Sequence, residues 1–217
     1  MAIGNLVLLA LYLVCSAADV CAAAKRSVRA ERVAKPLLMP LLLAFYLLTA
    51  KAPDRFLVLA LVCGFLGDTF LLGSGVWFAC GLGAFLLGHA FYIAAFLRPM
   101  DFSVLRLSFW LPGLISYVLY GAVACRRLLP HVGAKLRPAI LAYMVCLLGM
   151  SFAALLRLSY AGGAGFWLPL LGSLLFVASD TLLAFRIFAK KSEGSSGAAI
   201  MVTYTLAQLF IVLGFLP

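Results

Sequence analysis

The sequence predicts an all-α membrane protein, a bundle of about eight transmembrane helices, and three observations support this. Hydrophobic residues make up 66% of the 217 residues and the mean hydropathy is +1.16, whereas about half of a soluble domain is apolar. Charged residues account for only 11%, too few to cover a soluble surface. The apolar residues form long runs such as 41–48 and 168–178, without the apolar–polar alternation of a membrane barrel strand.

The apolar runs divide the chain into eight expected spans that form one transmembrane domain, residues 1–217. Their expected bounds are 3–20, 36–50, 56–73, 76–97, 104–125, 138–156, 166–187 and 198–216. The second span is expected to begin at Lys35-Pro36, because proline suits the first turn of a helix.

The net charge of +10 indicates the topology of the chain and gives no reason to expect nucleic-acid binding. Lys and Arg concentrate in the connections after the first, fifth and seventh spans, and such loops face the cytoplasm. Both termini are therefore expected on the non-cytoplasmic side, which requires an even number of spans. We expect the protein in a bacterial inner membrane, or in the endoplasmic reticulum membrane if the source is eukaryotic.

The residue types that bind metals or act as covalent nucleophiles form no recognisable motif. The six cysteines contain no Cys-x-x-Cys pair and are interpreted as small buried hydrophobic residues. No His-Glu-x-x-His or Gly-x-Ser-x-Gly sequence occurs. No metal or cofactor is expected.

Two carboxylates stand well inside apolar runs, Asp68 and Asp180. Charges are costly in a bilayer, so such residues are functional candidates. Each lies about a dozen residues from the non-cytoplasmic end of its span, which places both at one level, roughly 18–20 Å across the membrane. Asp19 lies near the end of its span, where Lys25 is close enough in sequence to pair with it.

Other polar residues are expected near the same level. His89 and Tyr92 share one helix face, as do Tyr204 and Gln208, and Lys35 is the nearest cation at the cytoplasmic mouth of the second span. Each also has a structural interpretation. The aspartates, Tyr204 and Gln208 can tie helices together by hydrogen bonds, His89 can be a core histidine, and Lys35 can be an interfacial anchor.

An ordered series of short motifs is similar to that of the YhhN-like lysoplasmalogenase family. The series is Lys35-Pro36, Gly67-Asp68, Gly83-Ala84-Phe85 with His89 and Tyr92, Leu174-Leu175-Phe176 before Ser179-Asp180, and Thr203-Tyr204 with Ala207-Gln208. The resemblance implies an eight-helix membrane hydrolase that cleaves the vinyl ether bond of a lysophospholipid, giving a fatty aldehyde and a glycerophospho-base. It also implies that Asp68 and Asp180 are catalytic.

Vinyl ether chemistry suits a pair of carboxyl groups. Protonation of the outer alkene carbon gives an oxocarbenium ion, to which water adds, so the reaction needs an acid, an anion and a positioned water. Either aspartate can be the acid, and Lys35 can meet the lipid phosphate, while His89, Tyr92, Tyr204 and Gln208 are expected to bind or orient the substrate. The alternative function is a proton- or cation-coupled transporter that uses the same aspartates. A structural protein, in which the pair only joins helices, is the third.

Overall fold

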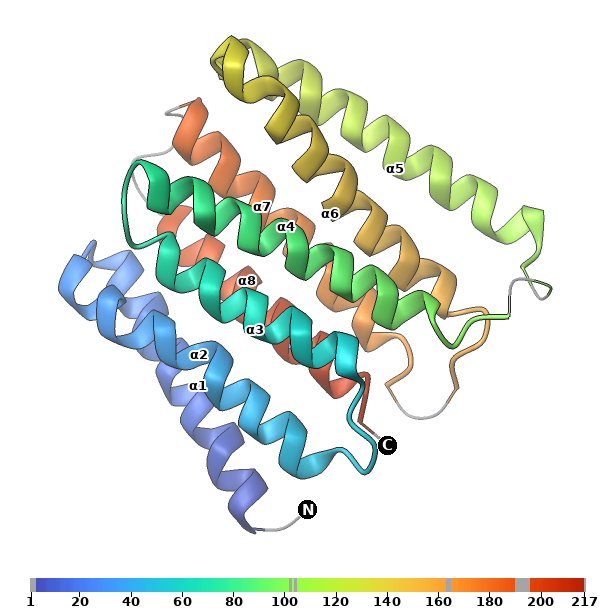
Figure 1. The fold of residues 1–217 in the computed structure, drawn as a ribbon, viewed down its shortest axis with the longest axis horizontal. Helices are drawn as coiled ribbons and strands as arrows, with labels where there is room; N and C mark the ends of the chain where they lie inside the picture. Colours follow the sequence, from blue (N-terminus) through green and yellow to red (C-terminus); the bar gives the residue numbers. More distant parts are fainter. Residues whose placement is uncertain (1–2, 102, 104, 163–164, 190–195, 217) are drawn as a thin grey trace.

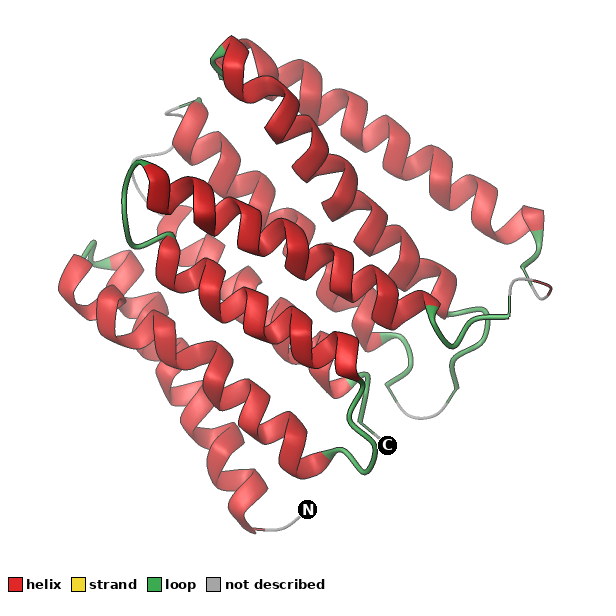
Figure 2. Cartoon of the chain, viewed as in Figure 1, coloured by secondary structure: helices red, strands yellow, loops and turns green. Residues whose placement is uncertain are grey.

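The chain folds as a bundle of long helices. In the computed structural model, residues 3–101, 103, 105–162, 165–189 and 196–216 are described, and these contain eight α-helices, two short 3-10 helices and no strand (Figures 1 and 2). The helices are α1 (Ile3–Ala24), α2 (Val28–Thr49), α3 (Arg55–Phe70), α4 (Val76–Leu97), α5 (Leu107–Leu128), α6 (Arg137–Arg157), α7 (Leu168–Phe188) and α8 (Ser196–Leu213). The 3-10 helices η2 (Leu129–His131) and η3 (Ala134–Leu136) connect α5 to α6.

Six of these helices, α1, α2, α4, α5, α6 and α7, are long and apolar enough to cross a membrane by length and composition. The apolar helices α3 and α8 are shorter, and α3 has only 16 residues. The chain is thus an all-helical integral membrane protein. The bounds expected for the fourth span, 76–97, are confirmed by α4.

The second helix begins eight residues earlier than the sequence predicted. It starts at Val28, after Ser27 at its N-cap, so Pro36 and Pro40 both lie inside it. The predicted start was wrong because the charges around Glu31 resemble a loop and a proline resembles a helix start. Prolines are tolerated within membrane helices because neighbouring groups compensate for the lost hydrogen bond. Consequently, Lys35 lies two turns inside α2.

Neighbouring helices pair along the chain, and the pairs then join into one bundle. The most extensive contacts are α7 with α8, α3 with α4 and α1 with α2, while α5 packs more sparsely on α6 and α7. The α7–α8 pair is so close that a Cβ atom on Gly172 would lie 2.6 Å from the Ala207 carbonyl oxygen. This pairing fixes the level of α7 against α8, and both carry polar residues of the candidate site.

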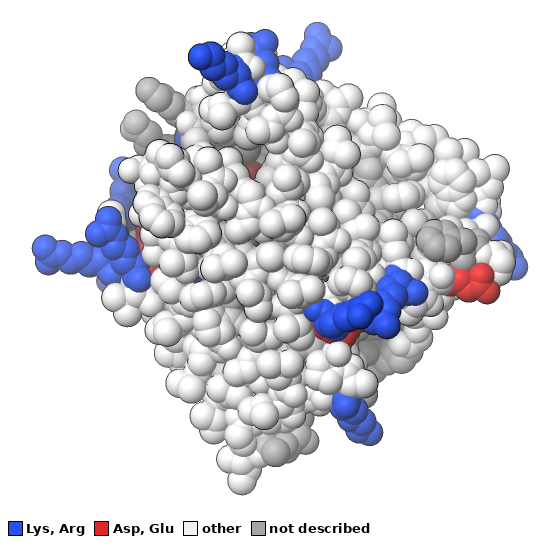
Figure 3. All heavy atoms as spheres, in the orientation of Figure 1, with Lys and Arg blue, Asp and Glu red and all other residues white. Residues whose placement is uncertain are grey.

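Apart from the buried carboxyl groups and Lys35, the charged side chains are mostly exposed and lie in or near the connections between helices. Figure 3 shows Lys and Arg near the margins of the molecule and in one group right of centre, with a broad face that shows no charged side chain over most of its area. The chain termini lie at one end of the bundle, and the α1–α2 turn at the other (Figure 1). This arrangement agrees with an even number of crossings, and the side of the membrane that each end faces stays a prediction.

Candidate functional site: two buried carboxyl groups

The two intramembrane aspartates occupy equivalent places on two helices. Asp68 lies near the end of α3 and Asp180 lies in α7, each about a dozen residues from the helix start. Asp68 is 1% exposed and the Asp180 side chain is 11% exposed. The Lys35 ammonium group acts electrostatically on both carboxyl groups. The two carboxyl groups stand at a similar count from the starts of their helices, and that they share one level of the membrane stays a prediction.

The Asp68 carboxyl group has a tyrosine and a cation as neighbours. The Tyr204 hydroxyl donates a hydrogen bond of 2.8 Å to Oδ2. Lys35 Nζ lies 3.8 Å from Oδ1, as an ion pair. Within the described residues, Oδ1 accepts no hydrogen bond. Since Lys35 comes from α2 and Tyr204 from α8, Asp68 connects three helices.

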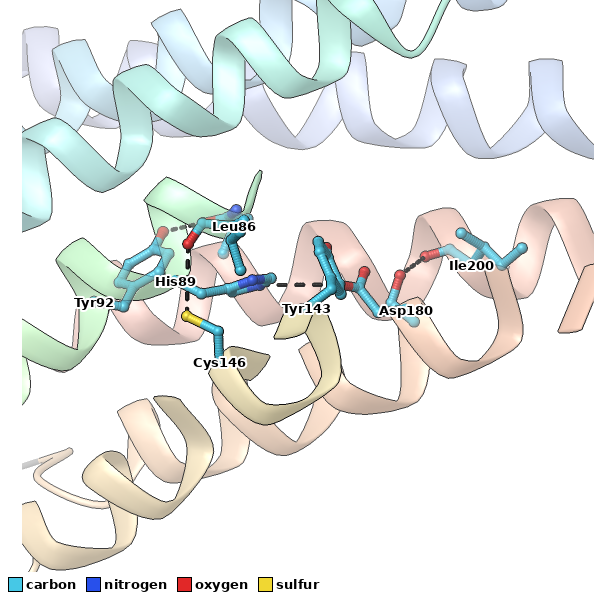
Figure 4. Close-up of polar contacts among 9 residues, drawn as sticks. Leu86, His89, Tyr92, Tyr143, Cys146, Asp180 and Ile200 are labelled. Atoms are coloured by element: carbon cyan, nitrogen blue, oxygen red, sulfur yellow. Dashed lines mark hydrogen bonds and ion pairs between the residues drawn. The ribbon is translucent and has the colours of Figure 1, made fainter. Parts of the chain in front are cut away.

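The Asp180 carboxyl group has different surroundings. The Tyr143 hydroxyl, from α6, donates a 2.6 Å hydrogen bond to Oδ2, and His89 Nε2 lies 3.9 Å from the same oxygen. In Figure 4 the His89 ring lies beside Tyr143, which leads on to Asp180. Neither ring nitrogen of His89 has a hydrogen-bond partner among the described residues. A buried imidazole with two open positions can bind a water or a substrate oxygen.

A cluster of aromatic rings connects the surroundings of the two carboxyl groups. Phe176 lies edge-on to Tyr204, with ring centroids 5.5 Å apart, and edge-on to His89 at 4.9 Å. Phe85 completes the cluster, with its centroid 6.0 Å from that of Tyr204. Edge-to-face pairs of this kind are attractive. The rings hold Tyr204 and His89 in fixed positions relative to each other.

The last two predicted residues form a separate polar pair. The Tyr92 hydroxyl donates a hydrogen bond to Oε1 of Gln208. Gln208 Nε2 is buried and has no hydrogen-bond partner among the described residues. It lies on the Asp68 side, because a Cβ atom on Gly64, four residues before Asp68, would be 3.6 Å away. The predicted residues therefore form three polar groups: Lys35 and Tyr204 at Asp68, His89 at Asp180, and Tyr92 with Gln208.

An apolar groove between α4, α5, α6 and α7 reaches Asp180. Its cavity volume is about 60 Å³ and its walls are almost entirely hydrocarbon. Tyr120 (40% exposed) and Ile187 (37% exposed) line it where it meets the lipid-facing surface. The Tyr120 hydroxyl lies 2.7 Å from Oγ1 of Thr181, the residue after Asp180. The groove therefore gives the Asp180 carboxyl group an apolar side that reaches the lipid-facing surface.

One residue of this region was not predicted, and for a second the suggested neighbour was wrong. Tyr143 was not singled out by the sequence, although it is the only tyrosine in its apolar run and stands at the depth of the aspartates. Asp19 was expected to pair with Lys25. That expectation was wrong, because Lys25 is exposed while Asp19 is fully buried, and the described residues show no ion pair between them.

The chain is similar in sequence to a protein family and to named relatives over most of its length. Residues 30–215 match the model of the YhhN family. Lysoplasmalogenase TMEM86B of Sus scrofa is 35% identical over 159 residues, which cover 71% of this chain and 60% of that protein. The Homo sapiens protein of the same name is 33% identical over 158 residues, covering 72% and 62%. The lysoplasmalogenase of Mycobacterium tuberculosis is 32% identical over 169 residues, covering 74% and 60%.

The chain spans about three fifths of the length of the curated relatives it matches. No solved structure matches it significantly.

Proposed function

Because the chain belongs to the YhhN family, we propose that it is an intramembrane lysoplasmalogenase, which hydrolyses the vinyl ether bond of a lysophospholipid to a fatty aldehyde and a glycerophospho-base. The relatives described above carry that name. The observation that carries the proposal is the pair of buried carboxyl groups in unlike surroundings, one beside a cation and one at the end of an apolar groove.

The surroundings divide the roles between the two carboxyl groups. Asp68 lies beside the Lys35 ammonium, which favours its ionised form. Asp180 has no Lys or Arg within 4 Å among the described residues and borders a hydrocarbon groove, which favours its protonated form. We therefore assign Asp180 as the proton donor and Asp68 as the anion. Two acids with different environments divide acid and base work in the same way in glycosidases.

The reaction follows from this assignment. The alkenyl chain lies in the groove with its double bond beside Asp180. Asp180 donates a proton to the outer alkene carbon, and the positive charge develops on the carbon bonded to the ether oxygen. Carboxylate charge stabilises this oxocarbenium ion. Water adds to that carbon and loses a proton to a carboxylate, and the resulting hemiacetal breaks down to the aldehyde and the free glycerol hydroxyl.

His89 Nε2 lies 3.9 Å from Asp180 Oδ2 and has no hydrogen-bond partner among the described residues, so it suits the binding of the attacking water. Tyr143 supports the carboxylate that Asp180 becomes when it loses its proton, because its hydroxyl already donates to Oδ2. Lys35 is the cation available to the lipid phosphate.

The test is aldehyde release from ethanolamine and choline lysoplasmalogens by the purified protein. Asp68→Asn and Asp180→Asn are compared with Asp101→Asn, which changes an exposed carboxylate in the connection between α4 and α5. We expect aldehyde from the wild type and from Asp101→Asn, and at least a hundredfold less from the other two variants, provided that all elute as folded protein.

A folded wild-type protein that releases no aldehyde would refute the proposed function and would favour transport through the same carboxyl groups. Aldehyde release that survives both intramembrane substitutions would retain the reaction and refute the two-carboxyl mechanism.

A further inference from the structure

A third carboxyl group lies buried on the Asp68 side of the site. Asp19, in α1, has an exposed fraction of 0%, and neither of its oxygens accepts a hydrogen bond from the described residues. A buried carboxylate without partners is costly. The family match begins at residue 30, so Asp19 belongs to the part of this chain outside it.

Further polar groups share this location. Ser16 Oγ, one turn before Asp19 on the same face of α1, is also buried without a hydrogen-bond partner in the described part of the chain. On α2, the charges of both Lys35 and Glu31 act on Asp19. Glu31 is half-buried and stands one turn before Lys35. The location therefore combines open hydrogen-bonding groups on α1 with a cation and a carboxylate on α2.

The charges near this location are unequal. Asp19 and Asp68 both interact with a single ammonium group, that of Lys35, and with each other. The Lys35 side chain keeps 19% exposure. Because carboxylates outnumber the ammonium group here, the positive group of a ligand would offset the excess charge at Asp19, and a negative group on the same ligand would face Lys35.

We propose that Asp19, with Ser16 beside it, binds the amine of a zwitterionic phospholipid head group while Lys35 binds the phosphate. This inference rests on the proposed function, because it places the head group of the same lipid whose alkenyl chain lies in the groove. An ethanolamine or choline group is joined to its phosphate by two carbons, which suits a cation site and an anion site on adjacent helices. Asp19 then selects lipids by head group and takes no part in the proton transfer.

The experiment compares wild type with Asp19→Asn on three substrates that share one alkenyl chain: ethanolamine lysoplasmalogen, choline lysoplasmalogen and the alkenyl glycerophosphate that lacks an amine. We expect Asp19→Asn to raise KM for the two amine lipids about tenfold or more, since a charge-assisted contact is lost. We expect kcat to change less than twofold and the amine-free lipid to be unaffected. Asp19→Glu restores part of the preference, and Ser16→Ala shows the same pattern with a smaller loss.

Two results would overturn the inference. An equal loss on all three substrates makes Asp19 a structural or positioning residue, and no change in any KM leaves it without a role in recognition. If Asp19→Asn does not fold, Asp19→Glu and Ser16→Ala provide the same comparison.

The proposed function can fail separately, when the folded wild type releases no aldehyde. Binding of the uncleavable saturated ether lysophosphoethanolamine, against the matching ether glycerophosphate, then decides the head-group site by itself. Tighter binding of the amine lipid by wild type than by Asp19→Asn supports the site, and equal binding refutes it.

Discussion

Replacing Tyr143 with Phe tests which carboxyl group donates the proton. The Tyr143 hydroxyl donates a 2.6 Å hydrogen bond to Asp180, and no other hydrogen bond to that carboxyl is present among the described residues. Such a bond contributes about 1.5–3 kcal/mol to a charged acceptor and about 0.5–1.5 kcal/mol to a neutral one. Because an acid becomes charged as it gives up its proton, losing the hydroxyl raises the barrier by the difference, about 1 kcal/mol. Tyr143→Phe should therefore lower kcat about fivefold.

The matched variant is Tyr204→Phe, which removes the 2.8 Å hydrogen bond to Asp68. Asp68 is a carboxylate both in the substrate complex and in the transition state of the proposed reaction. Losing the hydrogen bond therefore destabilises both states equally, and kcat should fall less than twofold. Both rings remain to pack against Phe176 or His89. The assay is the initial rate of aldehyde release at saturating lysoplasmalogen, with the unfolding temperature of each variant as the folding control. A fivefold loss in Tyr204→Phe with an unchanged Tyr143→Phe would refute Asp180 as the acid.

Three further predictions concern packing, the groove and the cation. Gly172→Ala should lower the free energy of unfolding by about 1–3 kcal/mol, because its Cβ would press on the α8 backbone. The control is Gly83→Ala, whose Cβ would have no atom within 4 Å. Measured as thermal unfolding in detergent, the first variant should have a lower midpoint and the control an unchanged one. Ala124→Phe should fill the groove and slow aldehyde release from a long-chain substrate at least tenfold more than from a six-carbon analogue; equal slowing would place the chain elsewhere. Lys35→Met should reduce kcat/KM at least tenfold, since it removes the cation beside Asp68, and Lys35→Arg should recover part of that loss.

The sequence predicted the helices well, because apolar runs can be counted along the chain; the depth of the carboxyl groups rests on the same counting and stays a prediction. Apolar runs mark spans, and a fixed rise per residue converts position to depth. The prediction failed at α2, where charges and two prolines obscured a helix that starts at Val28. The neighbours of each carboxyl group were harder to predict.

The rotation of a membrane helix about its axis is weakly encoded in its sequence. Lipid and protein core are both apolar, so the side facing the bundle has no hydrophobic signature comparable to that of a soluble helix. The sequence gives the position of Tyr143 along its helix. It does not give the hydrogen bond to Asp180, because that bond joins α6 to α7. That Asp19 lacks a hydrogen-bond partner among the described residues was likewise not predictable. Lys25 is near it in sequence but lies exposed at the helix end.

The groove beside Asp180 has a consequence for the fate of the products. Its walls are hydrocarbon and its rim, at Tyr120 and Ile187, lies on the lipid-facing surface, while Lys35 does not line the groove and keeps 19% exposure beside Asp68. Under the proposed reaction, the two halves of the cleaved lipid leave in different directions. The aldehyde diffuses sideways into the bilayer and the glycerophospho-base departs into water, so neither product has to retrace the path of the substrate. Separation into two phases would by itself limit product inhibition, and the reactive aldehyde would be delivered to enzymes that work within the same membrane.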